Sequence, residues 1–287
     1  MSLTDWVDWD KELFKTWIPH KPKLDIMGEL KAPPISKNYG TVGTAFDYVL
    51  RLLINRENVD LVSGFHIVAE HSIGKDKYRK SFVNEFKNKQ HEYVSDKSMK
   101  LDELLPMCII LAKMDSEYRC GLKIPDDDLF SYDTKDIKDL KNLVSLVDIS
   151  QFKAKERCLL NPTFGKSSQD IGGADADLVI DNTMIDIKTI KNLEFTAETF
   201  RQLMGYYLLH LRENKAFGDI KHLGIYYSRF GLLWKFEPEM VDPVLFEDIA
   251  FLEEISHDAK INIGEVKELR KSFWDEVEDS IKQYQEA

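Results

Sequence analysis

The chain has 287 residues, of which 43% are hydrophobic, and its aromatic side chains comprise 16 Phe, 11 Tyr and 5 Trp. This content can bury one large core or two modest ones, which excludes disorder over most of the chain. Acidic residues outnumber basic ones by 50 to 39, and the resulting net charge of −11 disfavours tight nonspecific binding of nucleic acid through phosphate attraction alone.

The sequence has no apolar N-terminal signal region. Its longest apolar stretch, residues 104–112, is far shorter than the roughly 20 residues of a membrane span. The cysteines are widely spaced and odd in number, which disfavours a disulfide framework and fits a reducing compartment: Cys108, Cys120 and Cys158. We expect buried apolar thiols, no iron–sulfur cluster, and a soluble, cytoplasmic protein that does not contact membranes.

A short amphipathic start is followed by an extended, proline-containing stretch at residues 19–34 and then by a helix at about 41–56. Residues from about 60 to 150 contain several amphipathic helical segments, which include 101–114 and 135–147. We interpret this helical region as an insertion before the first core strand, which the pattern places near residues 157–164.

A β-hairpin is predicted between residues 172 and 190, where two alternating runs are joined by Asp181 and Asn182. Side chains in a strand alternate between faces, so Asp175 and Asp177 share one face of the first run, and Asp186 and Lys188 share one face of the second. Burying an unpaired carboxylate costs several kcal/mol, so acids in so apolar a hairpin suggest a metal, a paired cation, or both.

The acid-x-lysine triplet alone carries little information, since it occurs ten times in the chain. Most copies lie in polar or helical segments, where the charges are solvated. Only Asp186-Ile187-Lys188 lies in a β-type run with a second acid-bearing strand at hairpin distance. The alternative is an edge hairpin with solvated charges, which the apolar residues 178–180, 185 and 187 disfavour.

A helix is predicted from about residue 196 to 211, with Gln202 and Tyr206 on one face beside an apolar stripe. On their own, these two residues would be read as ordinary helix-surface residues. Two further strands are predicted at 223–228 and 232–236, and the last fifty residues look helical.

Together these motifs resemble the PD-(D/E)XK nuclease superfamily, specifically its RecB-like branch: Asp177 followed by an apolar run, Asp186-x-Lys188, and then Gln202-x-x-x-Tyr206. The resemblance implies that Asp177, Asp186 and the backbone carbonyl of Ile187 bind Mg²⁺ or Mn²⁺. It also implies that Lys188 assists the attacking water or the scissile phosphate and that Gln202 and Tyr206 face the substrate.

Three assignments stay open at this stage. In the opening helix, Asp47 stands where some members of the family carry histidine, and Glu57 competes with it as the supporting acid. Asp175 lies about 7 Å from Asp177 on the same strand face and competes with it as the metal ligand, although the apolar run after Asp177 favours the latter. Asp175-x-Asp177 also resembles the Asp-x-Asp pair of metal-dependent nucleotide-sugar transferases, which do not require the later motifs.

Other charged groups give weaker indications. Basic residues between 75 and 89, including Arg79, Lys80 and Lys87, either line a nucleic-acid groove or form a solvated helix face. The seven histidines, among them His66 and His71, have no zinc-ligand spacing and are interpreted as structural or surface residues.

The sequence therefore predicts an α/β protein with a restriction-endonuclease-like core, in which a central mixed sheet is flanked by helices. We expect an N-terminal segment with the opening helix (1–58), a helical insertion (59–150), the nuclease core (151–240) and a helical C-terminal segment (241–287). The predicted function is metal-dependent hydrolysis of DNA, with RNA as the alternative substrate. Competing hypotheses are a catalytically silent nucleic-acid-binding or assembly protein on the same fold and the nucleotide-sugar transferase.

Overall fold

A computed structural model describes residues 2–62, 64–121, 123–259 and 261–287. Its centre is a mixed five-stranded sheet with the spatial order β1-β2-β3-β4-β5. Only β3 and β4 run parallel, and every other neighbouring pair is antiparallel. The strands are β1 (Cys158–Leu160), β2 (Leu178–Ile180), β3 (Thr183–Lys188), β4 (His222–Tyr227) and β5 (Leu232–Phe236).

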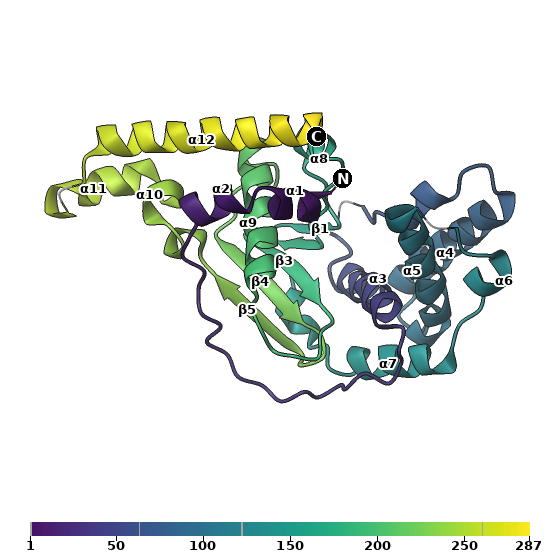
Figure 1. Cartoon of the computed structure of the whole chain (residues 1–287). Coiled ribbons are helices and arrows are strands. Elements are labelled where there is room, and N and C mark those ends of the chain that lie inside the picture. Colours follow the sequence, from purple (N-terminus) through teal and green to yellow (C-terminus); the bar gives the residue numbers. More distant parts are fainter. Residues whose placement is uncertain (1, 63, 122, 260) are drawn as a thin grey trace.

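Helices cover both faces of this sheet (Figure 1), so the α/β class, the flanking helices and the helical C-terminus are confirmed. One face carries α1 (Leu3–Trp9), α2 (Lys11–Trp17), α9 (Ala197–Arg212) and α12 (Ile263–Glu286). The other carries α3 (Tyr39–Glu57), α4 (Lys77–Ser95), α5 (Leu105–Cys120) and α7 (Thr134–Val144). The shorter helices are α6 (Asp126–Leu129), α8 (Gly165–Asp170), α10 (Pro243–Phe246) and α11 (Ile249–Ala259), with 3-10 turns at η1 (Val68–Ser72), η2 (Leu101–Glu103), η3 (Ile149–Phe152) and η4 (Pro238–Met240).

The predicted hairpin is β2–β3, and it is buried on both faces. Val179 and Met184 pair across the strands and belong to the core beneath α9, whereas Leu178 and Ile185 pair one step along and belong to the core beneath α3. Burial of alternate residues in two different cores explains why the run is almost continuously apolar. Asp181 adopts a left-handed φ of 51° at the turn.

The α9 face is closed by the two ends of the chain. The Trp6 Nε1 on α1 donates a 3.0 Å hydrogen bond to Ser280 Oγ on α12. Gly205 in α9 permits close packing of α1, since a Cβ at this position would lie only 2.8 Å from Val7 Cγ1. The glycine inside the Gln202-to-Tyr206 motif therefore serves helix packing.

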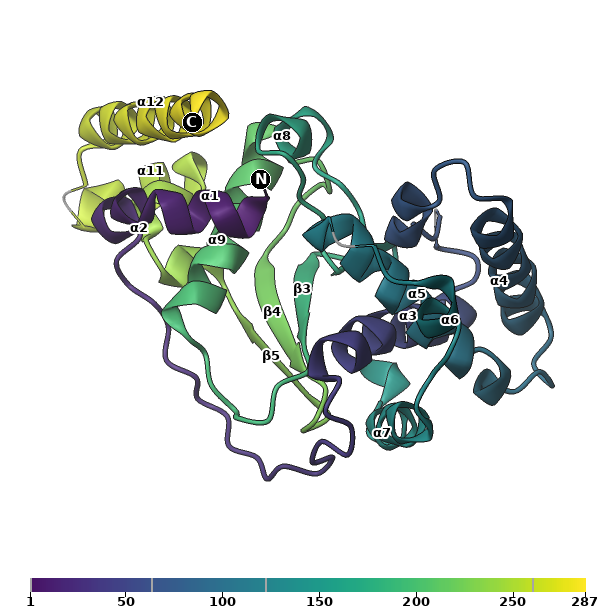
Figure 2. The same cartoon turned by 45° about the vertical axis from the view of Figure 1, so that its right-hand side comes forward.

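An extended segment between α2 and α3 passes along one end of the sheet (Figures 1 and 2) and is fixed by a buried ion pair. Arg229, in the β4–β5 turn, donates to both carboxylate oxygens of Asp139 on α7, at 2.8 and 3.3 Å, and to the Ala32 carbonyl at 2.9 Å. Asp139 in turn accepts hydrogen bonds from the backbone N–H groups of Ile35 and Ser36. One buried pair thus joins the sheet, a helix and the extended segment.

The structure changes some boundaries. The first core strand is shorter than predicted and ends at Leu160, because Asn161 has a φ of 56° and Pro162 follows it. The helices and later strands lie within a few residues of their expected positions. Cys108 and Cys158 are buried as expected, but Cys120, at the end of α5, is exposed, so that expectation was wrong for this residue. In the described ranges, no helix combines the length and the apolar character needed to cross a membrane.

Removal of the buried carboxylate should weaken the fold strongly. We expect Asp139→Ala to lower the free energy of unfolding by about 3–5 kcal/mol, because it leaves the Arg229 guanidinium, 1% exposed, without its counterion. Denaturant unfolding would measure this loss. The matched control is Asp102→Ala, which removes an exposed 2.6 Å pair with Lys141 and should cost less than about 1 kcal/mol. Equal losses in the two variants would contradict this role for the buried pair.

Candidate active site

The hairpin brings the two predicted acids together. Asp177 immediately precedes β2 and Asp186 lies in β3, so the pairing of Leu178 with Ile185 places the two acids opposite each other one step further along. Asp186 is buried, at 3% exposure, and Asp177 is partly buried. Asp177 Oδ2 accepts a 2.7 Å hydrogen bond from the backbone N–H of Ile187. This bond fixes the first carboxylate against the strand that carries the second.

Lys188 lies between the acids and α9. Its Nζ is 2.8 Å from Asp186 Oδ2 and donates a 2.9 Å hydrogen bond to Gln202 Oε1. Burial lowers the pKa of Lys188, but the neighbouring Asp186 and Asp177 outweigh this effect and hold the pKa above its usual value. The amine is therefore a charged donor rather than a proton acceptor.

Gln202 and Tyr206 continue this chain of contacts on α9. Gln202 Nε2 lies 3.2 Å from the Tyr206 hydroxyl, to which it donates a hydrogen bond. The Tyr206 ring is 8% exposed and stacks on Phe164, with ring centroids 5.6 Å apart and an interplanar angle of 12°. Burial and the nearby carboxylates raise the Tyr206 pKa, so the hydroxyl stays neutral. In this arrangement Gln202 contacts Lys188, and Tyr206, which has little exposed surface, contacts Gln202.

A third carboxylate reaches the site from α3. The α3 backbone passes close to the end of β3, since a Cβ on Gly43 would lie 3.6 Å from Thr189 Cβ. Asp47, one turn further along α3, pairs with Arg51 through Oδ2. Burial raises the pKa of Asp177 well above its usual value, and the charges of Asp186 and Asp47 raise it further. Three negative groups therefore meet in a poorly solvated place.

This donor set suits a hard divalent cation. Asp47 Oδ1 and Asp186 Oδ2 are buried and have no hydrogen-bond partner; the contact of the latter with Lys188 is an ion pair. No group of three or more His, Cys, Asp or Glu side chains among the described residues has an arrangement that could hold a metal ion. Mg²⁺ does not require such a group, since it is commonly bound by one or two carboxylates together with waters and substrate phosphates. Asp177 and Asp186 are two carboxylates that could hold such an ion.

The structure distinguishes the acids that competed for the same role, Asp175 with Asp177 as the metal ligand and Asp47 with Glu57 as the supporting acid. Asp175 forms an antiparallel bridge with Thr163, and the charges that act on it come from basic side chains, chiefly Arg119 and His66. Burial nevertheless raises the pKa of Asp175. Asp177, rather than Asp175, is thus the neighbour of Asp186. Glu57 lies ten residues beyond Asp47 on α3, about 15 Å along the axis, where it pairs with Lys153 at 3.6 Å.

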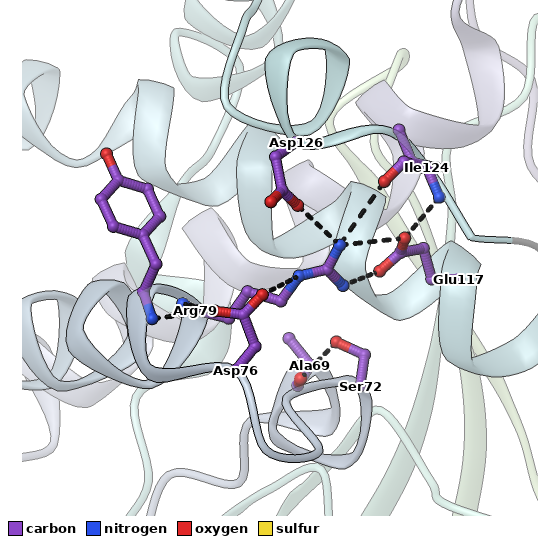
Figure 3. Close-up of polar contacts among 8 residues, drawn as sticks. Ala69, Ser72, Asp76, Arg79, Glu117, Ile124 and Asp126 are labelled. Carbon is purple, nitrogen blue, oxygen red and sulfur yellow. Dashed lines mark hydrogen bonds and ion pairs between the residues drawn. The ribbon is translucent and has the colours of Figure 1, made fainter.

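The buried Arg79 fits neither alternative left open for the basic run at residues 75–89, a nucleic-acid groove or a solvated helix face. Figure 3 shows its guanidinium enclosed by acids: it pairs with Glu117 and with Asp126 at 3.1 Å, and lies 3.5 Å from Asp76. The Arg79 side chain is 4% exposed and cannot reach a phosphate. Lys87, from the same basic run, pairs with Glu70.

Two histidines that appeared separate in the sequence meet beside the site. The ring centroids of His66 and His71 lie 5.9 Å apart, and Asn161 Nδ2 lies 3.2 Å from His66 Nδ1. Their spacing in the sequence gave no signal of this meeting, because it depends on how η1 packs against the C-terminal end of α5.

Comparisons of this chain with protein-family models, curated proteins and solved structures gave no match.

The crowding of carboxylates predicts a pH-dependent stability. A raised pKa means that Asp177 contributes most to stability below about pH 4 and that this contribution is lost as the pH rises through the folded-state pKa. We therefore expect Asp177→Asn, which keeps an oxygen for the Ile187 N–H, to stabilise the metal-free protein by about 1–3 kcal/mol at pH 8, since one pKa unit amounts to about 1.4 kcal/mol.

Denaturant unfolding in EDTA at pH 4 and pH 8 would measure the effect, which should be small at the lower pH. The control Glu85→Gln removes an exposed acid on α4 and should change stability by less than about 0.5 kcal/mol. A stability gain from Asp177→Asn that is equal at both pH values would contradict the electrostatic explanation.

Proposed function

We propose that this protein is a metal-dependent nuclease that hydrolyses phosphodiester bonds of DNA. The observation that carries the proposal is the convergence of Asp177, Asp186 and Lys188 on one buried site, with Gln202 bonded to the lysine. A carboxylate pair, an adjacent ammonium and the buried Asp47 Oδ1, which has no hydrogen-bond partner, form a donor set suited to Mg²⁺ or Mn²⁺ and to the phosphate of a substrate.

The proposal includes the assignment to the PD-(D/E)XK superfamily and its RecB-like branch. An antiparallel acid-bearing hairpin leads into α9, and β4 then returns parallel to β3. This arrangement agrees with the motif order that suggested the resemblance, and it supports a restriction-endonuclease-like core for the sheet.

In the proposed reaction, Asp177 and Asp186 would hold the cation, and Asp47 would support it from α3. The Oδ2 atom of Asp47 is held by its ion pair with Arg51. A cation held by these residues would lower the pKa of a bound water molecule and neutralise charge that develops on the phosphate. Lys188, held in its charged form, donates a hydrogen bond to the attacking water or to a phosphate oxygen.

Gln202 and Tyr206 act as positioning residues in this scheme. The Tyr206 hydroxyl fixes the amide of Gln202, whose oxygen then orients the Lys188 ammonium. The resemblance implied contact with the substrate, and the buried Tyr206 ring favours this indirect role.

The decisive experiment is cleavage of labelled single- and double-stranded DNA and RNA with Mg²⁺, Mn²⁺ or EDTA. We expect DNA cleavage that EDTA abolishes and that Asp186→Asn or Lys188→Ala reduces by roughly 10²–10³-fold, as is typical for the loss of one group that stabilises transition-state charge. The chain contains a matched control: Asp136-Ile137-Lys138 on α7 repeats the same tripeptide, and Lys138 is exposed.

Lys138→Ala should retain full activity. Cleavage that persists in Asp186→Asn and Lys188→Ala would overturn the site, and preferential cleavage of RNA would change the substrate. Metal-dependent stabilisation without cleavage of any substrate would instead favour a binding or assembly protein.

A further inference from the structure

A row of rings extends from the protein surface toward the acidic site. The Tyr118 ring, near the end of α5, stacks on the His71 ring with centroids 5.0 Å apart and an interplanar angle of 27°. The His71 ring lies 5.9 Å from that of His66. Tyr118 is 52% exposed, so one part of the row is open to solvent.

The inner end of the row reaches the first metal-binding acid of the proposed site. Asn161, whose amide lies beside His66, also donates a 2.8 Å hydrogen bond from its backbone N–H to the Asp177 carbonyl. Asn161 is buried and has a left-handed φ of 56°. The contacts Tyr118–His71–His66–Asn161 therefore connect the surface to the segment that carries Asp177.

Beside the outer end of the row lies an open hollow of about 600 Å³. Its wall is formed partly by the buried Arg79–Glu117 pair with Asp76, shown in Figure 3. Arg79 offsets only one of these two acids, so this part of the wall has a net charge of −1. The exposed cations on its rim are Lys75 and Lys123, and Arg119 follows Tyr118 on α5.

We propose that Tyr118 and His71 form a stacking platform for an unpaired nucleobase, and that Lys75, Arg119 and Lys123 contact the adjoining phosphates. The inference rests on the proposed nuclease function and deepens it, because it names a single-stranded segment as the substrate. The contacts through His66 and Asn161 link this platform to the segment that carries Asp177.

Two physical arguments favour a single strand over a duplex. An exposed aromatic ring can stack only on a base that is not already stacked within a helix, and such stacking is tolerant of sequence. The net charge of −11 gives weak general attraction for a duplex, whose binding depends mainly on phosphate contacts. A stacking contact supplies affinity that this acidic chain cannot obtain from charge alone.

The test measures binding separately from cleavage. Single-stranded DNA and RNA oligonucleotides that carry 2-aminopurine would be titrated with the full chain in EDTA, with anisotropy for affinity and 2-aminopurine fluorescence for stacking. We expect single-strand binding with quenching, and a roughly 5- to 100-fold loss of affinity in Tyr118→Ala. Tyr118→Phe should retain both signals, because its ring can still stack.

The matched control is Tyr132→Ala, which removes an exposed tyrosine outside the hollow and should leave affinity and quenching unchanged. If one oligonucleotide, DNA or RNA, binds more strongly than the other, that nucleic acid supplies the stacked base. Single-strand binding that Tyr118→Ala does not weaken, or loss of affinity without loss of quenching, would overturn the platform even if DNA is cleaved. Tyr118-dependent quenching without cleavage would support the platform and contradict the nuclease proposal.

Discussion

The burial of like charges around one ammonium is the constraint on which the proposed site depends. Asp177 and Asp186 face each other in a hairpin that is apolar on both sides, and burial raises the pKa of Asp177. Lys188 compensates only part of this charge, because it contacts Asp186 and is bonded on its other side to Gln202. A fold optimised for stability alone would replace such a group with apolar side chains. The proposed cation would explain why this charge is retained.

The surrounding architecture gives this unfavourable cluster a rigid frame. The hairpin is held between two cores, so its register cannot shift by one residue without moving the acids to the opposite face. The Asp181 carboxylate accepts hydrogen bonds from the backbone N–H groups of residues 155–157 and ties the hairpin turn to the approach of β1. The Arg229–Asp139 pair is a second polar anchor. It fixes the extended segment before α3, the helix that carries Asp47.

Local pattern was sufficient to predict the hairpin and α9, but not the contacts between distant segments. Alternation and the Asp181-Asn182 turn are local properties, so the acids could be placed opposite each other from sequence. Arg79 could not be judged in this way, since its partner Glu117 is 38 residues away along the chain. The meeting of His66 and His71 near Tyr118 depends likewise on tertiary packing.

The proposed substrate path likewise has one part fixed by local strand geometry and another part formed by tertiary packing. Asp186 and Lys188 lie on β3, and Asp177 immediately precedes β2. The geometry of these strands is fixed by backbone hydrogen bonds, which suits chemistry that tolerates little displacement. Tyr118 and His71 lie at the ends of a helix and a 3-10 turn, where a ring can adjust to whichever base arrives. A rigid centre for a chemically uniform phosphodiester, with an adaptable stacking surface for variable bases, is consistent with an enzyme that cuts without reading an extended sequence.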